Sequence, residues 1–345
     1  MSLDTLGDRR HIIDEIAENG HVTMVIGRVD TGKSTFCRQL ASAAIGKGRK
    51  VGVVDSDIGQ SWIGPPTTVG MKMLSGLQYP MLFPDSFYFV GNVSPEGHLL
   101  QTAIGAKLMV EEAQSLGAEL VIIDTTGLVD GNIGRALKLS KIDLIKPDHI
   151  VCFQRDSELE ALIKWIESGL CKVCRLKPSR FVEKKSQNQR FKYRLEQFRD
   201  YFSDAVPQEL SFLQVFGQRE IFLNGRMAND KEIDNISEII GSGVLYAEWF
   251  FKGLLIVLID SLDPMKARQL CSQLRIDELI VKKPEDFEDL LVALIDKDNK
   301  PISLGIIENI DFMNKKIVVK CKKDSVLDAL KIQISRFRIP DVRDL

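Results

Sequence analysis

The clearest chemistry in the sequence lies in one glycine-rich segment, Gly27-Arg-Val-Asp-Thr-Gly-Lys-Ser-Thr35. Its spacing of glycine, lysine and serine is that of a Walker A loop, in which successive backbone N–H groups turn inward around phosphates. In such a loop Lys33 reaches the β- and γ-phosphates, and Ser34 offers its hydroxyl to Mg²⁺. A glycine turn that only enters a helix is the alternative, but an apolar strand precedes the segment and a helical pattern follows it. We therefore expect ATP and Mg²⁺ to be bound here, by Gly27, Asp30, Thr31, Gly32, Lys33, Ser34 and Thr35.

Three aspartates follow two other apolar runs. Asp55 and Asp57 lie in Val54-Asp-Ser-Asp-Ile-Gly-Gln60, and Asp124 lies in Ile122-Ile-Asp-Thr-Thr-Gly127. Open α/β sheets bind ligands at the carboxyl ends of their strands, so we expect these side chains beside the phosphates. One member of the first pair can hold Mg²⁺ through water while the other accepts a proton from an attacking hydroxyl. Asp124 has the Walker B position, which orders the Mg²⁺ shell. Solvated aspartates that cap a strand end are the structural alternative.

Apolar runs alternate with helical patterns along the first half of the chain. The expected strands cover residues 22–26, 51–54, 87–90, 120–123 and 149–153, and the expected helices cover 8–18, 36–45 and about 98–116. Strands that are almost entirely apolar and alternate with helices indicate a parallel sheet with helices on both faces. We expect an α/β fold of the P-loop NTPase type.

The composition changes twice further along. Residues 172–199 carry ten Lys or Arg against two Glu, a local net charge of +8 in a chain whose total is −2. A uniformly basic nucleic-acid binder is excluded, but this excess indicates a surface for a polyanion, with a solvated basic helix as the alternative. Beyond about residue 211 the pattern predicts strands at 250–259, 291–295, 302–307 and 316–321. The 345 residues are therefore expected to form a kinase-type α/β domain over 1–210 and a smaller β-rich C-terminal domain over 211–345.

Two further segments help to choose among phosphate-loop classes. A GTPase needs a guanine-reading Asn/Thr-Lys-x-Asp after a strand, and the only near match, Ser140-Lys-Ile-Asp143, falls at the end of an expected helix. The sequence therefore disfavours a GTPase. The loop Gly91-Asn-Val-Ser-Pro-Glu-Gly-His98 follows an expected strand. It either faces a substrate or is a plain connection capped by Ser94.

Together, the motifs Gly27–Thr35, Asp55-Ser-Asp-Ile-Gly-Gln60, Gly91-Asn-Val-Ser-Pro95 and Asp124-Thr-Thr-Gly127 resemble the polynucleotide 5′-hydroxyl kinase family. This family includes the kinase subunit of the eukaryotic pre-mRNA cleavage machinery, a nucleolar rRNA-processing kinase, and archaeal and bacterial relatives. The resemblance covers about residues 20–205 and implies transfer of the ATP γ-phosphate to the 5′-hydroxyl of RNA or DNA. It places Asp57 on the general base, Gln60 on a phosphate- or Mg²⁺-shell position, and Ser94 in the loop that grips the 5′-terminal phosphodiester. Because the Walker A loop begins at residue 27, we expect a prokaryotic-type member without the N-terminal β-domain of eukaryotic members.

The resemblance also implies an arginine lid over the triphosphate, within the basic segment of about 172–202. Arg190 and Arg194 are four residues apart and share one helix face, so both guanidinium groups can point at one phosphate group. On the substrate side the resemblance places Thr126 and Leu128. Leu128 stands where eukaryotic members carry an aromatic residue, and it offers apolar contact without base stacking.

The remaining features set the cellular context and the rival interpretations. A zinc site built from His149, Cys152, Cys171 and Cys174 is disfavoured, because residues three apart on a strand point to opposite faces. The longest apolar run, residues 253–259, is too short to span a bilayer, and the N-terminus has no apolar signal core. With six cysteines that suit a reduced compartment, a soluble cytoplasmic protein with no membrane partner is expected. A kinase acting on a 5′-hydroxyl nucleic-acid end leads over a nucleotide-dependent switch and an ATP-binding scaffold for RNA processing. A switch needs neither a proton acceptor such as Asp57 nor a polyanion surface.

Overall fold

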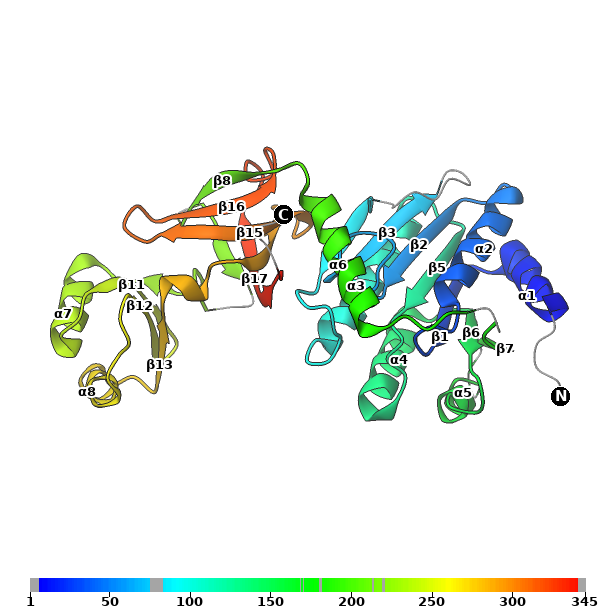
Figure 1. Ribbon diagram of the computed structural model, residues 1–345, viewed down its shortest axis with the longest axis horizontal. Helices are drawn as coiled ribbons and strands as arrows, with labels where there is room; N and C mark the ends of the chain where they lie inside the picture. The colour runs from blue at the N-terminus through cyan, green and yellow to red at the C-terminus, as the bar shows by residue number, and fades with distance from the viewer. Residues whose placement is uncertain are drawn as a thin grey trace. The chain divides into compact units, whose positions relative to one another are not determined.

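The computed structural model of the chain (Figure 1) describes residues 6–74, 83–167, 169, 171–179, 182–212, 214–218 and 221–340. Contacts between Cα atoms divide the chain into two compact units, Met1–Phe198 and Arg199–Leu345. Two parts of the sequence predictions, Arg180 of the basic segment and the first five residues of the N-terminus, lie outside the described residues.

The first unit is built around a seven-stranded sheet with the strand order β4-β3-β2-β5-β1-β6-β7 (Figure 1). Its elements are α1 (Leu6–Asn19), β1 (Val22–Gly27), α2 (Lys33–Gly46), β2 (Val51–Ser56), β3 (Thr68–Leu74), β4 (Ser86–Phe89), α3 (Leu99–Ser115), β5 (Leu120–Thr125), α4 (Gly131–Ile145), β6 (His149–Phe153), α5 (Glu160–Ile166) and β7 (Lys172–Leu176). Helix α6 (Gln187–Phe202) follows and crosses the division between the units.

Helices cover both faces of this sheet, as the uninterrupted apolar runs predict. On one face α1 and α2 pack against alternate strand residues such as Val25, Val53 and Ile122. On the other face α3, α4 and α5 pack against the strand residues that alternate with these, such as Met24 and Ile123. The predicted α/β fold class is confirmed, and every helix predicted for this unit is present.

The edge formed by β3 and β4 differs from the prediction of an all-parallel sheet. Strands β2, β5, β1, β6 and β7 are parallel, but β3 pairs antiparallel with β2 and β4 pairs antiparallel with β3. Strand β3 was not predicted, because Gly70 and Lys72 interrupt its apolar pattern. Gly70 is required there, since a Cβ would come into collision with the backbone carbonyl of Ile63. β4 itself runs in the same direction as β2, because two antiparallel pairings separate them, but its neighbour in the sheet is the unpredicted β3.

The second unit contains two sheets, with the strand orders β10-β11-β12-β13 and β8-β16-β15-β14-β17-β9. Its elements are β8 (Ala205–Ser211), β9 (Phe216–Gln218), β10 (Arg226–Met227), α7 (Asp230–Ile240), β11 (Val244–Phe250), β12 (Gly253–Leu258), α8 (Pro264–Leu274), β13 (Glu278–Lys282), a 3₁₀ turn (Pro284–Asp286), β14 (Leu290–Ile295), β15 (Pro301–Asp311), β16 (Lys316–Lys322) and β17 (Lys331–Arg338). The expected boundary after residue 210 lies inside β8, which pairs along its length with β16.

Three of the four strands predicted for this unit correspond to β14, β15 and β16. The fourth, predicted over 250–259, corresponds to β12, but its predicted start is wrong, because Phe250 is the last residue of β11, which was not predicted. The chain reverses at Phe251-Lys252, where Lys252 has φ 54°, and β11 and β12 form an antiparallel hairpin. Among the described residues, no helix of either unit combines the length and apolarity needed to cross a membrane.

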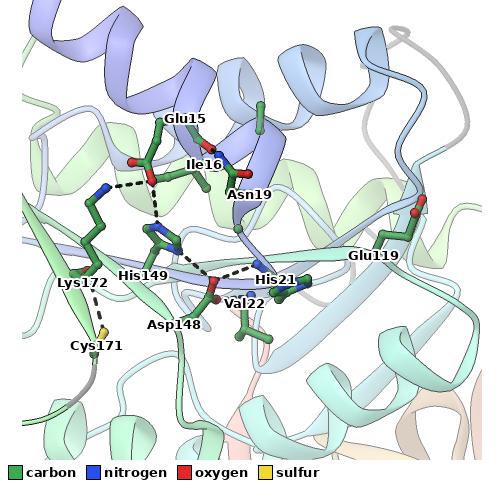
Figure 2. A network of polar contacts seen from close by, with 12 residues as sticks. Glu15, Ile16, Asn19, His21, Val22, Glu119, Asp148, His149, Cys171 and Lys172 are labelled. Atoms are coloured by element: carbon green, nitrogen blue, oxygen red, sulfur yellow. Dashed lines mark hydrogen bonds and ion pairs between the residues drawn. The ribbon is translucent and has the colours of Figure 1, made fainter.

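A network of ionic side chains lies at the amino end of the first unit's sheet (Figure 2). The His149 ring makes contacts from both nitrogens, with Asp148 at 2.8 Å and with Glu15 of α1 at 3.4 Å. Lys172 also reaches Glu15, at 2.8 Å, and Asp148 accepts hydrogen bonds from the backbone N–H groups of residues 21 and 22. The network therefore fastens α1 to β1, β6 and β7 on the side of the sheet away from the glycine-rich loop.

Candidate active site

The glycine-rich loop joins the buried strand β1 to α2, as its sequence predicts. Asp30 and Gly32 have positive φ values of 52° and 89°, which turn the backbone around the loop. Gly27 has no room for a side chain, since a Cβ would lie 2.8 Å from the Cβ of Phe153. The ammonium group of Lys33 donates to the carbonyl oxygen of Arg28 at 2.8 Å, and the Thr31 hydroxyl donates to the same oxygen. The side chain of Lys33 therefore lies along the inside of the phosphate loop.

Asp124 lies at the carboxyl end of β5 and is almost completely buried. Its Oδ2 accepts a hydrogen bond from the indole N–H of Trp62 at 3.2 Å, whereas its Oδ1 has no hydrogen-bond partner within the part of the chain that is described. Burial raises the pKa of Asp124, and the positive charge of Lys33 and the nearby hydroxyl of Ser34 oppose the rise. A buried carboxylate oxygen without a donor, beside a serine hydroxyl, offers the hard oxygen ligands that Mg²⁺ prefers.

Asp55 lies opposite Asp124 on the neighbouring strand β2, but its oxygens are already engaged. Oδ2 accepts from the backbone N–H of Trp62 at 2.6 Å and from the Ser61 hydroxyl at 2.9 Å, and Oδ1 accepts from the backbone N–H of Asp57. Burial raises its pKa, and the negative charge of Asp124 adds to the rise. The structure therefore uses Asp55 to hold the loop after β2, which leaves it poorly placed for the metal role expected from the sequence.

Asp57 has the free oxygen that Asp55 lacks. Its Oδ1 accepts from the backbone N–H groups of Gly59 and Gln60 at 3.2 and 3.1 Å. No described residue donates to Oδ2. Gln60 turns its amide N–H toward the carbonyl oxygen of Arg190 in α6 at 3.2 Å, and its buried Oε1 has no partner in the described part of the chain. The loop after β2 thus presents one free carboxylate oxygen and one free amide oxygen.

Helix α6 brings the second half of the basic segment to the phosphate loop, whereas Lys172 and Arg175 are paired with glutamates elsewhere. Arg190 forms an ion pair with Asp30 of the loop at 2.5 Å, and the phenol of Tyr193 donates to the carbonyl of Ser61 at 2.8 Å. Burial of the Tyr193 ring raises its pKa to about 12. Arg194 has no hydrogen bond or ion pair to a described residue. Burial and the charge of Arg190 lower its pKa, and the charge of Asp57 opposes them. The expected pair of arginines therefore converges here, although Arg190 is held by Asp30.

Two loops that the motifs assigned to the substrate lie beside these residues. Gly59 approaches the loop containing Ser94, since a Cβ on the glycine would lie 2.6 Å from the carbonyl oxygen of Val93. Ser94 accepts from the backbone N–H of Glu96, and α3 begins only at Leu99, so the alternative that Ser94 caps this helix is wrong.

The loop after β5 touches the phosphate loop directly. A Cβ at Gly127 would lie 2.5 Å from the backbone nitrogen of Val29, so only glycine fits this approach. Leu128 is half-buried, whereas Thr126 is almost fully buried and its hydroxyl accepts from Lys138. Leu128 can therefore meet a substrate, while the Thr126 side chain is engaged within the protein.

Sequence reasoning overlooked three contributors to the site. The side chains of Lys138 and Lys141, on α4, lie completely buried beneath it. Their only sequence signal is a pair of lysines among the apolar positions of an amphipathic helix. Trp62 was interpreted as a packing residue, and it is buried, but it also donates to Asp124 and lies under the guanidinium of Arg38 at 4.6 Å.

A phosphate loop between a parallel strand and a helix, with an acidic residue at the end of the adjacent strand, defines a P-loop nucleotide-binding protein. A family model described as the P-loop of the mRNA cleavage and polyadenylation factor CLP1 matches residues 27–204, more than half of the chain. The chain belongs to this family, and the resemblance expected from the motifs is confirmed.

Similar proteins are known from archaea and from solved structures. A polyribonucleotide 5′-hydroxyl-kinase of Methanocaldococcus jannaschii is 30% identical over 324 residues, which cover 92% of this chain and 87% of the relative. One of Thermococcus kodakarensis is 31% identical over 344 residues, which cover 98% of this chain and 94% of the relative. A chain of the wild-type Clp1p–Pcf11p complex is similar in structure, with a TM-score of 0.66 at 13% identity, over 98% of this chain and 80% of that chain. The last likeness shows a shared fold.

Proposed function

We propose that the protein is an ATP-dependent polyribonucleotide 5′-hydroxyl kinase, with the first unit as its catalytic module. The observation that carries this proposal is that Oδ2 of Asp57 and the guanidinium of Arg194 lie in the same site as the phosphate loop, each without a partner among the described residues. A protein that only binds a nucleotide has no need of such a proton acceptor. The names of the archaeal relatives support RNA as the acceptor.

In the proposed reaction the 5′-oxygen of the RNA forms a bond to the γ-phosphorus as the bond to the β,γ-bridging oxygen breaks. ADP leaves with the electron pair of that bond, and the proton of the 5′-hydroxyl passes to Oδ2 of Asp57. Lys33 exchanges its contact with the carbonyl of Arg28 for the β- and γ-phosphate oxygens. Arg194 supports the negative charge on the moving phosphoryl group, and Arg190 joins it by giving up Asp30.

Asp124 and Ser34 are the residues that we assign to Mg²⁺. The fit rests on the buried, unpartnered Oδ1 of Asp124. When bound, Mg²⁺ neutralises charge on the β- and γ-phosphates. Asp55 is left out of this assignment, since its oxygens hold the loop that carries Asp57 and Trp62.

We also propose that the protein works in the cytoplasm. Its six cysteines are all free thiols, which suits a reducing compartment.

Purified protein incubated with ATP labelled at the γ-phosphate and an oligoribonucleotide with a 5′-hydroxyl end tests the proposal. We expect label on the oligonucleotide, and none on a matched oligonucleotide that already carries a 5′-phosphate. Release of labelled phosphate alone, at a rate indifferent to the oligonucleotide, would refute the kinase and favour a nucleotide-dependent switch. Binding of ATP with neither transfer nor hydrolysis would favour a scaffold.

A further inference from the structure

Two completely buried lysines lie one helical turn apart on α4, at positions 138 and 141. An ammonium group removed from water is costly unless it is hydrogen-bonded or paired with charge. Neither lysine belongs to a motif in the sequence, and the proposed reaction uses neither. Their hydrogen-bond partners therefore indicate why they are present.

Lys141 connects the strands that carry the two working carboxylates. Its ammonium donates to the Ser56 hydroxyl at 2.8 Å, and that hydroxyl donates to the backbone carbonyl of Asp124 at 2.7 Å. Ser56 is the last residue of β2 and directly precedes Asp57. One ammonium group thus ties the end of β2, where the proposed base begins, to the end of β5, where the proposed metal ligand lies.

Lys138 connects the next pair of strands. It donates to the carbonyl oxygen of Thr126 at 2.7 Å and to the Thr125 hydroxyl at 3.0 Å. The Thr125 hydroxyl in turn donates to the carbonyl of Val25 in β1 at 2.7 Å. Lys138 therefore fixes the beginning of the Thr126–Leu128 loop and joins it to the strand that leads into the phosphate loop.

The charge of Lys141 also offsets the negative charge of the aspartates at this end of the sheet. Burial lowers the pKa of Lys141 to about 8, while the negative charges of Asp57, Asp55 and Asp124 oppose the loss of its proton, so it is charged at neutral pH. Three carboxylates are gathered at this end of the sheet. When Lys33 turns to the phosphates, Lys141 remains as a buried positive charge beside them. Burial and the charges of Lys141 and Lys33 lower the pKa of Lys138, so its part rests on its hydrogen bonds.

We propose that Lys138 and Lys141 are positioning residues for phosphoryl transfer, an inference that rests on the proposed kinase function. Lys141 sets the position of Asp57 and Asp124, and so acts on turnover and on Mg²⁺. Lys138 sets the position of the Thr126–Leu128 loop, and so acts on the RNA. The two residues divide the work although they share a helix face.

The test uses the full chain with Lys141→Met and Lys138→Met, which keep the length of the side chain and remove its charge and donors. Lys146→Met is the matched control, because Lys146 is the exposed cap residue at the end of the same helix. We expect Lys141→Met to lower kcat about 10- to 100-fold, the scale of a small misplacement of reacting groups, with the KM for RNA within about twofold. It also raises the Mg²⁺ concentration for half-maximal ATP binding several-fold.

Lys138→Met is expected to change the KM for RNA instead of kcat. It raises the KM for a 5′-hydroxyl oligoribonucleotide about 5- to 10-fold, with the Mg²⁺ requirement of ATP binding unchanged. Kinetic constants within about twofold of wild type in both variants would overturn the proposal, as would the same loss of kcat in both, since a merely structural role does not separate kcat from KM.

Two further measurements keep the result decisive. If a lysine variant does not fold, two other variants keep the lysines and remove a hydroxyl that accepts from one of them. Ser56→Ala removes the acceptor of Lys141, and Thr125→Val removes an acceptor of Lys138. Ser56→Ala must then reproduce the loss of kcat and Thr125→Val the rise in KM, and wild-type values would overturn the proposal. If wild-type protein transfers no label, the proposed function fails. The Mg²⁺ dependence of ATP binding in Lys141→Met then still decides the positioning role of Lys141.

Discussion

The two ends of the central sheet differ in whether the carboxylate, imidazole and amide groups buried there have hydrogen-bond partners. At the amino end, both ring nitrogens of His149 and both oxygens of Asp148 have partners, and Glu15 is shared by His149 and Lys172 (Figure 2). At the carboxyl end, the Oδ1 of Asp124 and the Oε1 of Gln60 are buried with no partner in the described part of the chain. The same sheet thus carries a completed network at one end and an incomplete one at the other.

An unsatisfied buried polar atom costs about 1–3 kcal/mol of stability, so two of them at one end need a reason. Both atoms are acceptors, so a ligand that brings a cation and donates hydrogen bonds gives that reason. The network of Glu15, Asp148, His149 and Lys172 at the amino end has no such vacancy and holds α1 on the sheet, although the uncharged hydroxyl of Thr23 in β1 is also buried without a described partner. The contrast predicts that substitutions at the carboxyl end change catalysis and that substitutions at the amino end change stability.

The largest effect is expected for Lys33→Ala. It removes the ammonium group that reaches the β- and γ-phosphates and should abolish phosphoryl transfer. The melting temperature should stay close to that of wild type, because the hydrogen bond of the lysine goes to a loop carbonyl and its charge acts on Asp124, whose pKa is already raised by burial. Label transfer to a 5′-hydroxyl oligoribonucleotide is the measurement, and transfer near the wild-type rate by a folded variant would contradict the whole assignment of this end of the sheet.

Asp57→Asn should lower kcat about 10²–10⁴-fold, because it removes the proton acceptor and keeps the shape of the loop. The KM for ATP should change little. Single-turnover kinetics at saturating ATP and RNA would measure the loss. An unchanged rate would show that another group takes the proton.

Replacing both Arg190 and Arg194 with alanine should lower kcat about 10²-fold, since their charge acts mainly on the moving phosphoryl group. The control is Lys192→Ala with Arg199→Ala, two exposed positions on the same helix. If α6 only clamps the polyanion, the arginine variant would instead bind RNA more weakly, with a salt slope shallower by about one to two units and a normal kcat at saturation.

Asp55→Asn tests whether the place of a residue in the sheet or the completeness of its hydrogen bonds decides between an effect on catalysis and an effect on stability. It lies at the carboxyl end, but its network is complete, so we expect loss of stability by about 2 kcal/mol, as for a disrupted buried hydrogen-bond network. The Mg²⁺ dependence of the remaining activity should match that of wild type. A raised Mg²⁺ requirement without loss of stability would return Asp55 to the metal site.

The smallest effect is expected at the amino end. His149→Phe should lower the free energy of unfolding by about 1 kcal/mol and leave kcat unchanged. The hydrogen bond to Asp148 raises the pKa of His149 above 6.5, so this contribution is fully present below about pH 6.5 and disappears as pH rises through the folded-state pKa. Urea unfolding of both proteins at pH 6 and pH 9 should show the difference only at pH 6. An equal difference at both values would mean that the charge of His149 contributes nothing.

The sequence predicted the parts of this design that are written in local patterns. Continuous apolar runs predicted the central strands, and the spacing of glycine, lysine and serine predicted the phosphate loop, because both depend on near neighbours in the chain. Arg190 and Arg194 were placed together for the same reason, by one turn of a helix.

What could not be predicted depends on contacts between distant segments. The difference between Asp55 and Asp57 arises from the return of residues 61–63 onto the end of β2, which a two-residue spacing does not reveal. Lys138 and Lys141 look like solvated lysines until α4 is packed under the strand ends. Strand β3 escaped notice because its pairing with β2 outweighs its broken apolar pattern.

Because Gly127 has no side chain, the loop after β5 can lie directly against the phosphate loop. A Cβ at Gly127 would collide with both the backbone nitrogen and the Cγ1 of Val29, so the two loops are in close contact and a shift of one is expected to move the other. Variation is therefore channelled to the next residue, Leu128, whose half-buried side chain can be enlarged or reduced without separating the two loops. In the proposed kinase, such a change at Leu128 would alter the contact with the first nucleotide of the RNA while the phosphate loop keeps its position.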